Sequence, residues 1–325
     1  MDFMLRSEQW ELKQPFRITG QEWLHSECIV VEVTDGGSTG RGEAQGVSYL
    51  GEDIARMTTQ IQNIAEKLKS GLTRDELATL LPAGGARNAV DCALWDLEAK
   101  QRAQTIWQLT GIDPKPVTTV FTIGIEASPE LMAEKAAAAR AYPVLKIKLD
   151  DHQPYERLAA IRAARPDARL VVDANQGWSF EQLKAILPKC AGLGLDMIEQ
   201  PLPRGADEEL DGLDSPVTLA ADESCQDSSE LEIAARRYDM INIKLDKTGG
   251  LTEALKLARQ AREMGCKLMV GNMLGTSLSM APSFVVAQLC DFVDIDGPLL
   301  MRHDREFGMH YNNAVVEVFD SRLWG

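Results

Sequence analysis

The chain has 325 residues, of which 45% are hydrophobic and 26% are charged, which is typical of a folded globular protein with a substantial core. Its formal net charge of −15 argues against nucleic acid or an anionic membrane surface as a partner, because both repel a strongly acidic protein. The six cysteines include no CxxC pair, and no apolar run approaches the ~20 residues of a membrane span. With no signal-peptide pattern at the N-terminus, we expect a soluble cytoplasmic protein with reduced thiols.

The first third of the chain predicts a strand pair followed by helices. Residues 28–33 are rich in β-branched side chains, and the turn-rich residues 35–40 lead into a second segment at 41–43. Residues 86–102 change to helical spacing, with an apolar stripe that includes Ala89, Ala93 and Leu97.

From about residue 117 onward, short apolar strands alternate with helices. The candidate strands begin near Val120, Val144, Leu170, Met197, Thr218, Met240, Leu268 and Phe292. Their spacing of roughly 20 to 28 residues is the length of one strand, one crossover helix and two loops. Eight such units predict a (β/α)-barrel. A doubly wound open sheet is the alternative, but no glycine-rich phosphate loop follows any early strand.

Two lysines stand on one face of the second barrel strand. Lys146 and Lys148 alternate with the apolar Leu145, Ile147 and Leu149, so the lysines are expected to face inward together. A lysine beside another lysine in a partly desolvated site loses basicity and can act as a general base. A solvent-facing pair on an edge strand is the alternative.

The next three strands each end on an acid, namely Asp173, Glu199 and Asp222. Successive strands of a barrel place these side chains around one mouth, where three like charges repel unless a cation neutralises them. Oxygen ligands with open positions suit Mg²⁺. A single acid at a strand end would be a helix cap or a solvated loop residue, but three in succession favour a metal site.

The sixth strand carries Asn242, Lys244 and Asp246, which are expected to share one face. Lys244 would then face Lys148 across the barrel mouth. Such a pair can remove the α-proton of a metal-bound carboxylate from one face and return a proton from the other. Lys146 and the metal would hold the enediolate formed on the way.

The eighth strand ends with Asp294 and Asp296, two residues apart and therefore on one face. This second acidic pair suits a cationic group on the substrate, and a solvated turn is the alternative. The four histidines are not paired with acids at strand ends, which argues against a His–Asp base or a zinc site.

The ordered motifs KxK, DAN, EQP, ADES and IKLDKTGG resemble the enolase superfamily, in its muconate-lactonising-enzyme subgroup, and most of all its dipeptide epimerases. The resemblance covers essentially the whole chain. It implies an α/β fold with an α+β capping domain at residues 1–112, completed by the tail at about 308–325, and a modified (β/α)₇β TIM-like barrel at 113–307. It also implies an isomerase with Mg²⁺ on Asp173, Glu199 and Asp222.

The same resemblance assigns roles to the lysines and to the acidic pair. Lys148 and Lys244 would be the acid/base catalysts, with Lys146 polarising the substrate carboxylate. Asp294 and Asp296 would hold the free ammonium of a dipeptide that is epimerised at its C-terminal residue. The leading substrate expectation is L-Ala-D/L-Glu. An N-succinylamino acid racemase or o-succinylbenzoate synthase is the alternative, and a non-catalytic binding barrel is an alternative of another class.

The resemblance also points to further residues of the site. Epimerases of Ala-Glu are expected to offer a cation from a cap loop, and Arg17 either serves this role or faces solvent. Trp23 and Tyr49 either line the pocket or pack the cap on the barrel, and Gly275 stands where related enzymes often carry an acid. We also expect Thr122 and Met273 to bind the substrate. Asn175, Glu223 and Asn242 are expected to hold the catalytic and metal-binding side chains in place. Whether the protein forms a homo-oligomer is left open.

Overall fold

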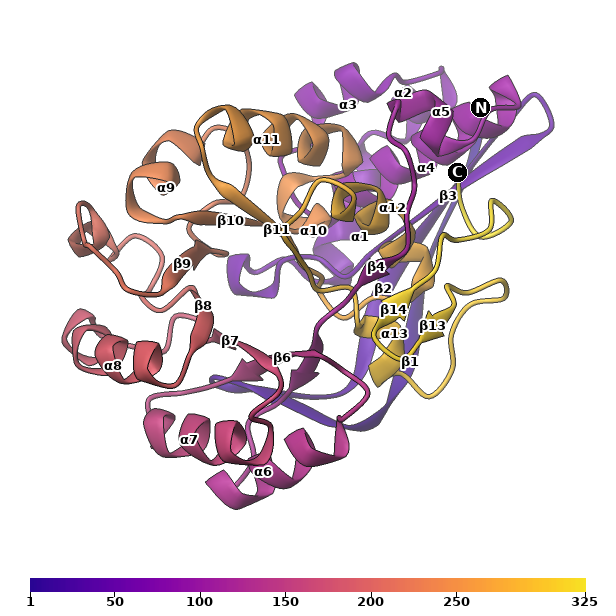
Figure 1. Ribbon diagram of the computed structural model, residues 1–325. Coiled ribbons are helices and arrows are strands. Elements are labelled where there is room, and N and C mark those ends of the chain that lie inside the picture. The colour runs from indigo at the N-terminus through magenta and orange to yellow at the C-terminus, as the bar shows by residue number, and fades with distance from the viewer.

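An antiparallel sheet forms the first part of the molecule, which is described over residues 1–325 by a computed structural model (Figure 1). Its strands are β1 (Asp2–Ile18), β2 (Gln21–Asp35) and β3 (Ser38–Ala44). Helices α1 (Ile54–Asn63), α2 (Ala65–Lys69), α3 (Arg74–Leu80), α4 (Gly85–Arg102) and α5 (Ile106–Thr110) follow. The predicted strand pair and long helix are confirmed. Strand β1 was not predicted, because it is a largely exposed edge strand rich in polar side chains.

Helix α4 packs directly on β3, and two glycines make this close approach possible. A Cβ atom at Gly40 would lie 2.1 Å from the carbonyl oxygen of Ala93, and one at Gly42 would lie 2.1 Å from that of Ala89. Any larger residue at these two positions would therefore push the helix away from the sheet.

A curled parallel sheet of eight strands forms the second part. The strands are β5 (Phe121–Ile123), β6 (Val144–Lys148), β7 (Arg169–Asp173), β8 (Leu195–Glu199), β9 (Thr218–Ala221), β10 (Met240–Ile243), β11 (Lys267–Val270) and β12 (Phe292–Val293). The Val120 N–H donates a 2.8 Å hydrogen bond to the Val293 carbonyl, so the two edges of the sheet meet. The eight predicted strands and the modified barrel are confirmed.

Helices connect the strands and cover the outside of the curled sheet (Figure 1). They are α6 (Pro129–Ala138), α7 (Pro154–Ala164), α8 (Phe180–Gly192), α9 (Leu231–Arg237), α11 (Leu251–Glu263) and α12 (Ser277–Ala287). The four-residue helices α10 (Leu245–Thr248) and α13 (Gly297–Leu300) follow the ends of β10 and β12. Helix α6 begins with an N-cap, since the Ser128 side chain accepts a hydrogen bond from the Leu131 N–H and Pro129 stands at the first position.

The two parts of the molecule have separate apolar cores. A cluster of 17 buried residues lies between the antiparallel sheet and its helices, and one of 59 lies mainly between the barrel strands and their outer helices. Inside the barrel, a third cluster consists of Val120, Val144, Val171, Met197, Ala220, Met240 and Met269. Val144, Val171, Met197 and Ala220 each stand two residues before a charged residue, so the cluster forms an apolar floor beneath the charged end of the barrel.

The C-terminal segment returns to the first part of the chain. Strand β14 (Val315–Val316) pairs with β13 (Tyr311–Asn312) on one side and with β4 (Val117–Thr118) on the other. The Trp324 indole N–H donates to the Cys92 carbonyl of α4 at 3.1 Å. The six cysteines form no disulfide bond. None of the helices combines the length and the apolar character that a membrane crossing requires.

Candidate active site

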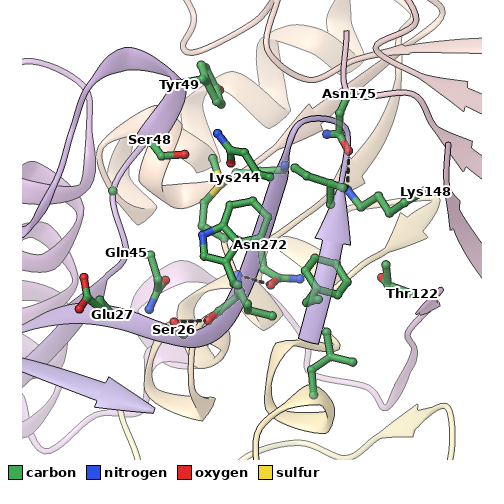
Figure 2. A pocket seen from close by; sticks show the side chains of 18 of the residues that line it. Ser26, Glu27, Gln45, Ser48, Tyr49, Thr122, Lys148, Asn175, Lys244 and Asn272 are labelled. Carbon is green, nitrogen blue, oxygen red and sulfur yellow. Dashed lines mark hydrogen bonds between the residues drawn. The ribbon is translucent and has the colours of Figure 1, made fainter. Parts of the chain in front are cut away.

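A cavity of about 320 Å³ lies between the antiparallel sheet and the carboxyl ends of the barrel strands (Figure 2). One wall comes from β1, β2 and the segment after β3, and the barrel supplies the other. Nine of the residues predicted from the sequence line this cavity, namely Thr122, Lys146, Lys148, Asn175, Glu223, Lys244, Met273, Asp294 and Asp296. Asp173, Glu199, Asp222 and Asn242 are fully buried next to it.

The three predicted lysines reach the cavity from two strands. Lys146 and Lys148 lie on the same inward face of β6, which overturns the edge-strand alternative. Lys244 follows β10, and Figure 2 shows its side chain and that of Lys148 entering the cavity from different sides. The Asn175 side-chain oxygen accepts a 3.2 Å hydrogen bond from the Lys148 ammonium.

Three buried carboxylates lie against these ammonium groups. Asp173 Oδ2 is 2.6 Å from Lys148 Nζ and 3.1 Å from Lys146 Nζ. Glu199 Oε2 is 2.8 Å from Lys146 Nζ, and Asp222 Oδ2 is 2.6 Å from Lys244 Nζ. The predicted convergence of three acids from successive strands at one mouth is therefore present, and each acid contacts at least one lysine.

The acids and lysines shift one another's protonation. Burial, with the charge of Asp173 added, raises the pKa of Glu199 to about 7. Burial alone would lower the pKa of Lys146 and of Lys244, but the carboxylates outweigh it and raise both pKa values above the ordinary range. The expectation that clustering lowers the basicity of the lysines is therefore wrong for Lys146 and Lys244 in the metal-free protein, because each of these two ammonium groups has acids beside it. A cation bound by the acids would remove that stabilisation.

The acid trio has the donor chemistry of a Mg²⁺ site. The carboxylates are not gathered round one point in this arrangement, since lysine ammonium groups lie against them. However, Glu199 Oε2 and Asp222 Oδ1 are buried oxygens that accept no hydrogen bond, although each is 2.8 Å from a lysine nitrogen. Hard oxygens with unsatisfied lone pairs fit Mg²⁺. Asn242 Nδ2 donates to the other Glu199 oxygen at 2.7 Å and holds that side chain in place.

A fourth buried lysine supports the trio and was missed from the sequence. Lys247 on α10 donates hydrogen bonds to the carbonyl oxygens of Asp222, Cys225 and Asn242, and its Nζ is 2.8 Å from Asp222 Oδ1. It thereby ties the segment that carries Asp222 to the end of β10. The IKLDKTGG motif contains this lysine, but spacing alone did not distinguish it from a surface residue.

Asp246 does not share a strand face with Asn242 and Lys244, which corrects the prediction. Strand β10 ends at Ile243, and the chain turns into α10 so that Asp246 points to the cap. Its Oδ1 accepts hydrogen bonds from the backbone N–H groups of Gln45 at 3.0 Å and Gly46 at 2.8 Å. Asp246 therefore fixes the cap segment that forms one wall of the cavity.

Replacing Asp246 with alanine is expected to raise KM for the substrate about tenfold while changing kcat much less, because two hydrogen bonds that hold the cavity wall are lost. Steady-state kinetics measures this difference. Asp91→Ala is the matched control, since Asp91 also joins cap to barrel, through the Thr252 N–H and hydroxyl. Thr252 does not line the cavity, whereas Gln45 and Gly46, the partners of Asp246, do. An equal rise in KM for both variants would contradict the assignment.

The eighth-strand acids are buried, so the solvated-turn alternative is wrong. Asp294 Oδ2 is 2.8 Å from Lys146 Nζ, and Asp296 Oδ2 accepts a 2.7 Å hydrogen bond from the Thr122 N–H. Burial, followed by the charge of Asp294, raises the pKa of Asp296 to about 7. Lys146 also contacts Asp173 and Glu199, so it joins this pair to the acid trio. Of the two acids in the pair, only Asp294 has a lysine beside it, so the pair suits a further cation from a substrate.

The structure decides between the alternatives that the sequence left open for the cap residues. Arg17 lies outside the cavity, with its side chain 44% exposed and its guanidinium 3.0 Å from Glu22. Trp23 and Tyr49 both line the cavity, and the Tyr49 hydroxyl accepts a 2.9 Å hydrogen bond from Gln226 Nε2. Other lining residues that were missed are Phe16, Gln21, His25, Gln45, Ser48 and Asn272. Cap positions lacked a signal because their place depends on how the cap docks.

Steric crowding explains why this chain has a glycine at position 275. A Cβ atom there would lie 2.6 Å from Ser279 Cβ and 2.8 Å from Gln45 Oε1, so an acid has no room. A cap acid instead supports the next residue, because Glu43 accepts hydrogen bonds from the N–H and the hydroxyl of Thr276.

A parallel barrel with paired lysines above three buried acids defines an enzyme that moves protons at a carbon beside a carboxylate. Family models match nearly the whole chain. The mandelate racemase/muconate lactonizing enzyme N-terminal domain matches residues 1–111, and the enolase C-terminal domain-like model matches residues 131–319. The chain therefore belongs to the enolase superfamily, in its mandelate racemase/muconate lactonizing enzyme group.

Individual relatives agree with this assignment. L-Ala-D/L-Glu epimerase of Escherichia coli is 43% identical over 96% of this chain and 98% of its own length. N-acetyl-D-glutamate racemase of a Pseudoalteromonas species is 39% identical over 91% and 95%. The crystal structure of an Agrobacterium tumefaciens enolase family member with bound sodium and L-Ala-L-Glu matches with a TM-score of 0.97 and 42% identity, over 99% of both chains. Other dipeptide epimerases of this fold were solved with Mg and a dipeptide.

Proposed function

We propose that the protein is a Mg²⁺-dependent dipeptide epimerase that inverts the α-carbon of the C-terminal residue. The observation that carries this proposal is that one cavity holds Lys148, Lys244 and the buried pair Asp294 and Asp296. The lysines supply an acid and a base on two sides of a carbon, and the acidic pair supplies a site for a free ammonium group. The relatives named as epimerases, among them the L-Ala-D/L-Glu enzyme, support the same reading.

The mechanism follows from the placement of these side chains. Asp294 and Asp296 bind the N-terminal ammonium and so orient the dipeptide with its α-carbon between Lys148 and Lys244. One lysine, as the free amine, takes the α-proton, and the other, as the ammonium, donates a proton to the opposite face. Lys146 donates to the substrate carboxylate as negative charge develops there. Asp173, Glu199 and Asp222 would hold Mg²⁺, which would supply further positive charge for that carboxylate.

The test incubates the protein with Mg²⁺ in D₂O with free L,L-dipeptides, N-acetylamino acids and N-succinylamino acids, and follows deuterium incorporation by mass spectrometry. We expect a gain of one deuterium at the α-carbon of the C-terminal residue of free dipeptides. Exchange confined to the N-acyl compounds would favour a racemase of N-acylamino acids, a candidate that the Pseudoalteromonas relative supports. Exchange on none of them would contradict the proposed function.

The acidic pair allows a sharper prediction. Asp296→Asn is expected to lower kcat/KM for free dipeptides roughly 10- to 100-fold, because a neutral amide no longer pairs with the substrate ammonium. Turnover of the same dipeptides carrying an N-acetyl group, already poor in the wild type, is expected to change little. The comparison of free and acetylated substrates is the measurement, and an equal loss on both would show that Asp296 acts through the fold alone.

The domain boundaries and the location in the cell are part of the proposal. Residues 1–112 with the tail at about 308–325 would form the capping domain and residues 113–307 the catalytic barrel. An apolar core made only of residues between 29 and 97 supports a separate domain in the first part of the chain. A cytoplasmic location is supported by six cysteines without a disulfide bond.

A further inference from the structure

The cap wall of the cavity is apolar where β1 and β2 approach it. Phe16, Ile18 and Trp23 line the cavity there. Phe16 and Trp23 are direct partners across the two strands, with ring centroids 6.3 Å apart and ring planes inclined by 32°. Because side chains alternate along a strand, Arg17 between Phe16 and Ile18 points away from the cavity, where it pairs with Glu22.

The positive charges that line the cavity already have acidic partners. They are Lys146, Lys148 and Lys244, which contact Asp294, Asp173 and Asp222 at 2.6–2.8 Å. His25, which would add a charge only when protonated, lies 3.7 Å from Glu27. Of these groups, only His25 stands on the cap side of the cavity.

The cap side adds negative rather than positive charge. Glu27, Glu52 and Asp53 all line the cavity from this side. A carboxylate on a substrate side chain would therefore lose water on this wall without gaining an unpaired cation, and such a transfer is unfavourable. An apolar side chain loses no hydrogen bonds to water on the same wall and gains contact with two aromatic rings.

We propose, on the basis of the function proposed above, that the apolar wall of Phe16, Ile18 and Trp23 binds the side chain of the epimerised residue and so determines substrate specificity. Asp294 and Asp296, together with Lys148 and Lys244, engage the dipeptide backbone from the barrel side and leave the cap side to the side chain. Dipeptides whose C-terminal residue is uncharged and apolar are then turned over at least as well as dipeptides that end in glutamate.

The experiment compares kcat/KM of the Mg²⁺-loaded protein for L-Ala-L-Leu, L-Ala-L-Phe and L-Ala-L-Glu, measured by α-deuterium exchange. Values for the leucine or phenylalanine dipeptide that equal or exceed the glutamate value support the inference. A glutamate value above both overturns the inference but leaves the epimerase function intact. Exchange on none of the three overturns the inference and the proposed function together.

Variants of the wall give a second, independent readout. Trp23→Arg places a cation on the wall and is expected to raise the glutamate-to-leucine ratio of kcat/KM about tenfold, the effect of roughly 1.4 kcal/mol of ion pairing. Trp23→Leu keeps the wall apolar and is the matched control, expected not to raise the ratio. Arg17→Ala is expected to leave the ratio unchanged, because the guanidinium points outward. A selective tenfold loss on the glutamate dipeptide in Arg17→Ala would overturn the inference.

Discussion

Replacing Lys244 with methionine is expected to lower the epimerisation rate about 10³-fold, because the acid or base on one side of the substrate carbon is lost while the shape of the buried chain is largely kept. Lys148→Met is expected to cause a loss of similar size from the other side. Steady-state turnover of a dipeptide in the presence of Mg²⁺ measures both effects. Lys184→Met, on the exposed surface of α8, is the control and should leave turnover unchanged.

The stereochemistry of the remaining exchange distinguishes two bases from one. If Lys148 and Lys244 serve opposite faces, each methionine variant should lose α-deuterium exchange on one epimer of the dipeptide and keep measurable exchange on the other. The two variants should fail on opposite epimers. Loss of exchange on the same epimer in both variants would contradict a two-base mechanism and leave one of the lysines with a supporting role.

Replacing Glu199 with glutamine is expected to weaken Mg²⁺ binding by about 100-fold or more and to abolish turnover at ordinary Mg²⁺ concentrations, because one of the three anionic ligands becomes neutral. Calorimetric titration of the metal-free protein with Mg²⁺ measures the affinity without relying on catalysis. Glu181→Gln, on the surface of α8, is the control. Chelation of the metal should likewise stop turnover in the wild type, and added Mg²⁺ should restore it.

The same variant separates metal binding from folding. Glu199 is a fully buried carboxylate beside Asp173, and burial raises its pKa to about 7, so the ionised form is disfavoured in the metal-free fold. Glu199→Gln should therefore raise the thermal unfolding temperature of the metal-free protein at pH 8 and remove the stabilisation that Mg²⁺ gives the wild type. A lower unfolding temperature without metal would show instead that the ion pair with Lys146 dominates.

The barrel half of the site was predictable from the sequence because it depends on local geometry. Alternation along β6 places Lys146 and Lys148 on one face whatever the rest of the chain does. Acids that directly follow the apolar runs of β7, β8 and β9 must meet at one end of a parallel sheet. Residue type and position within a strand are therefore enough to predict that three lysines, three acids and an acidic pair meet at one mouth.

Only the tertiary structure showed which cap residues line the cavity and which charged groups contact one another. Arg17 and Trp23 stand on neighbouring strands, and only the docking of that hairpin over the barrel turns Trp23 into the cavity and Arg17 out of it. Asp246 accepts a hydrogen bond from a backbone N–H group about 200 positions earlier in the chain, and Lys247 forms an ion pair with Asp222. The pKa values of Lys146 and Lys244 rise because acids from other strands come within hydrogen-bonding distance. Strand alternation is a property of consecutive residues, whereas these contacts depend on how distant segments pack together.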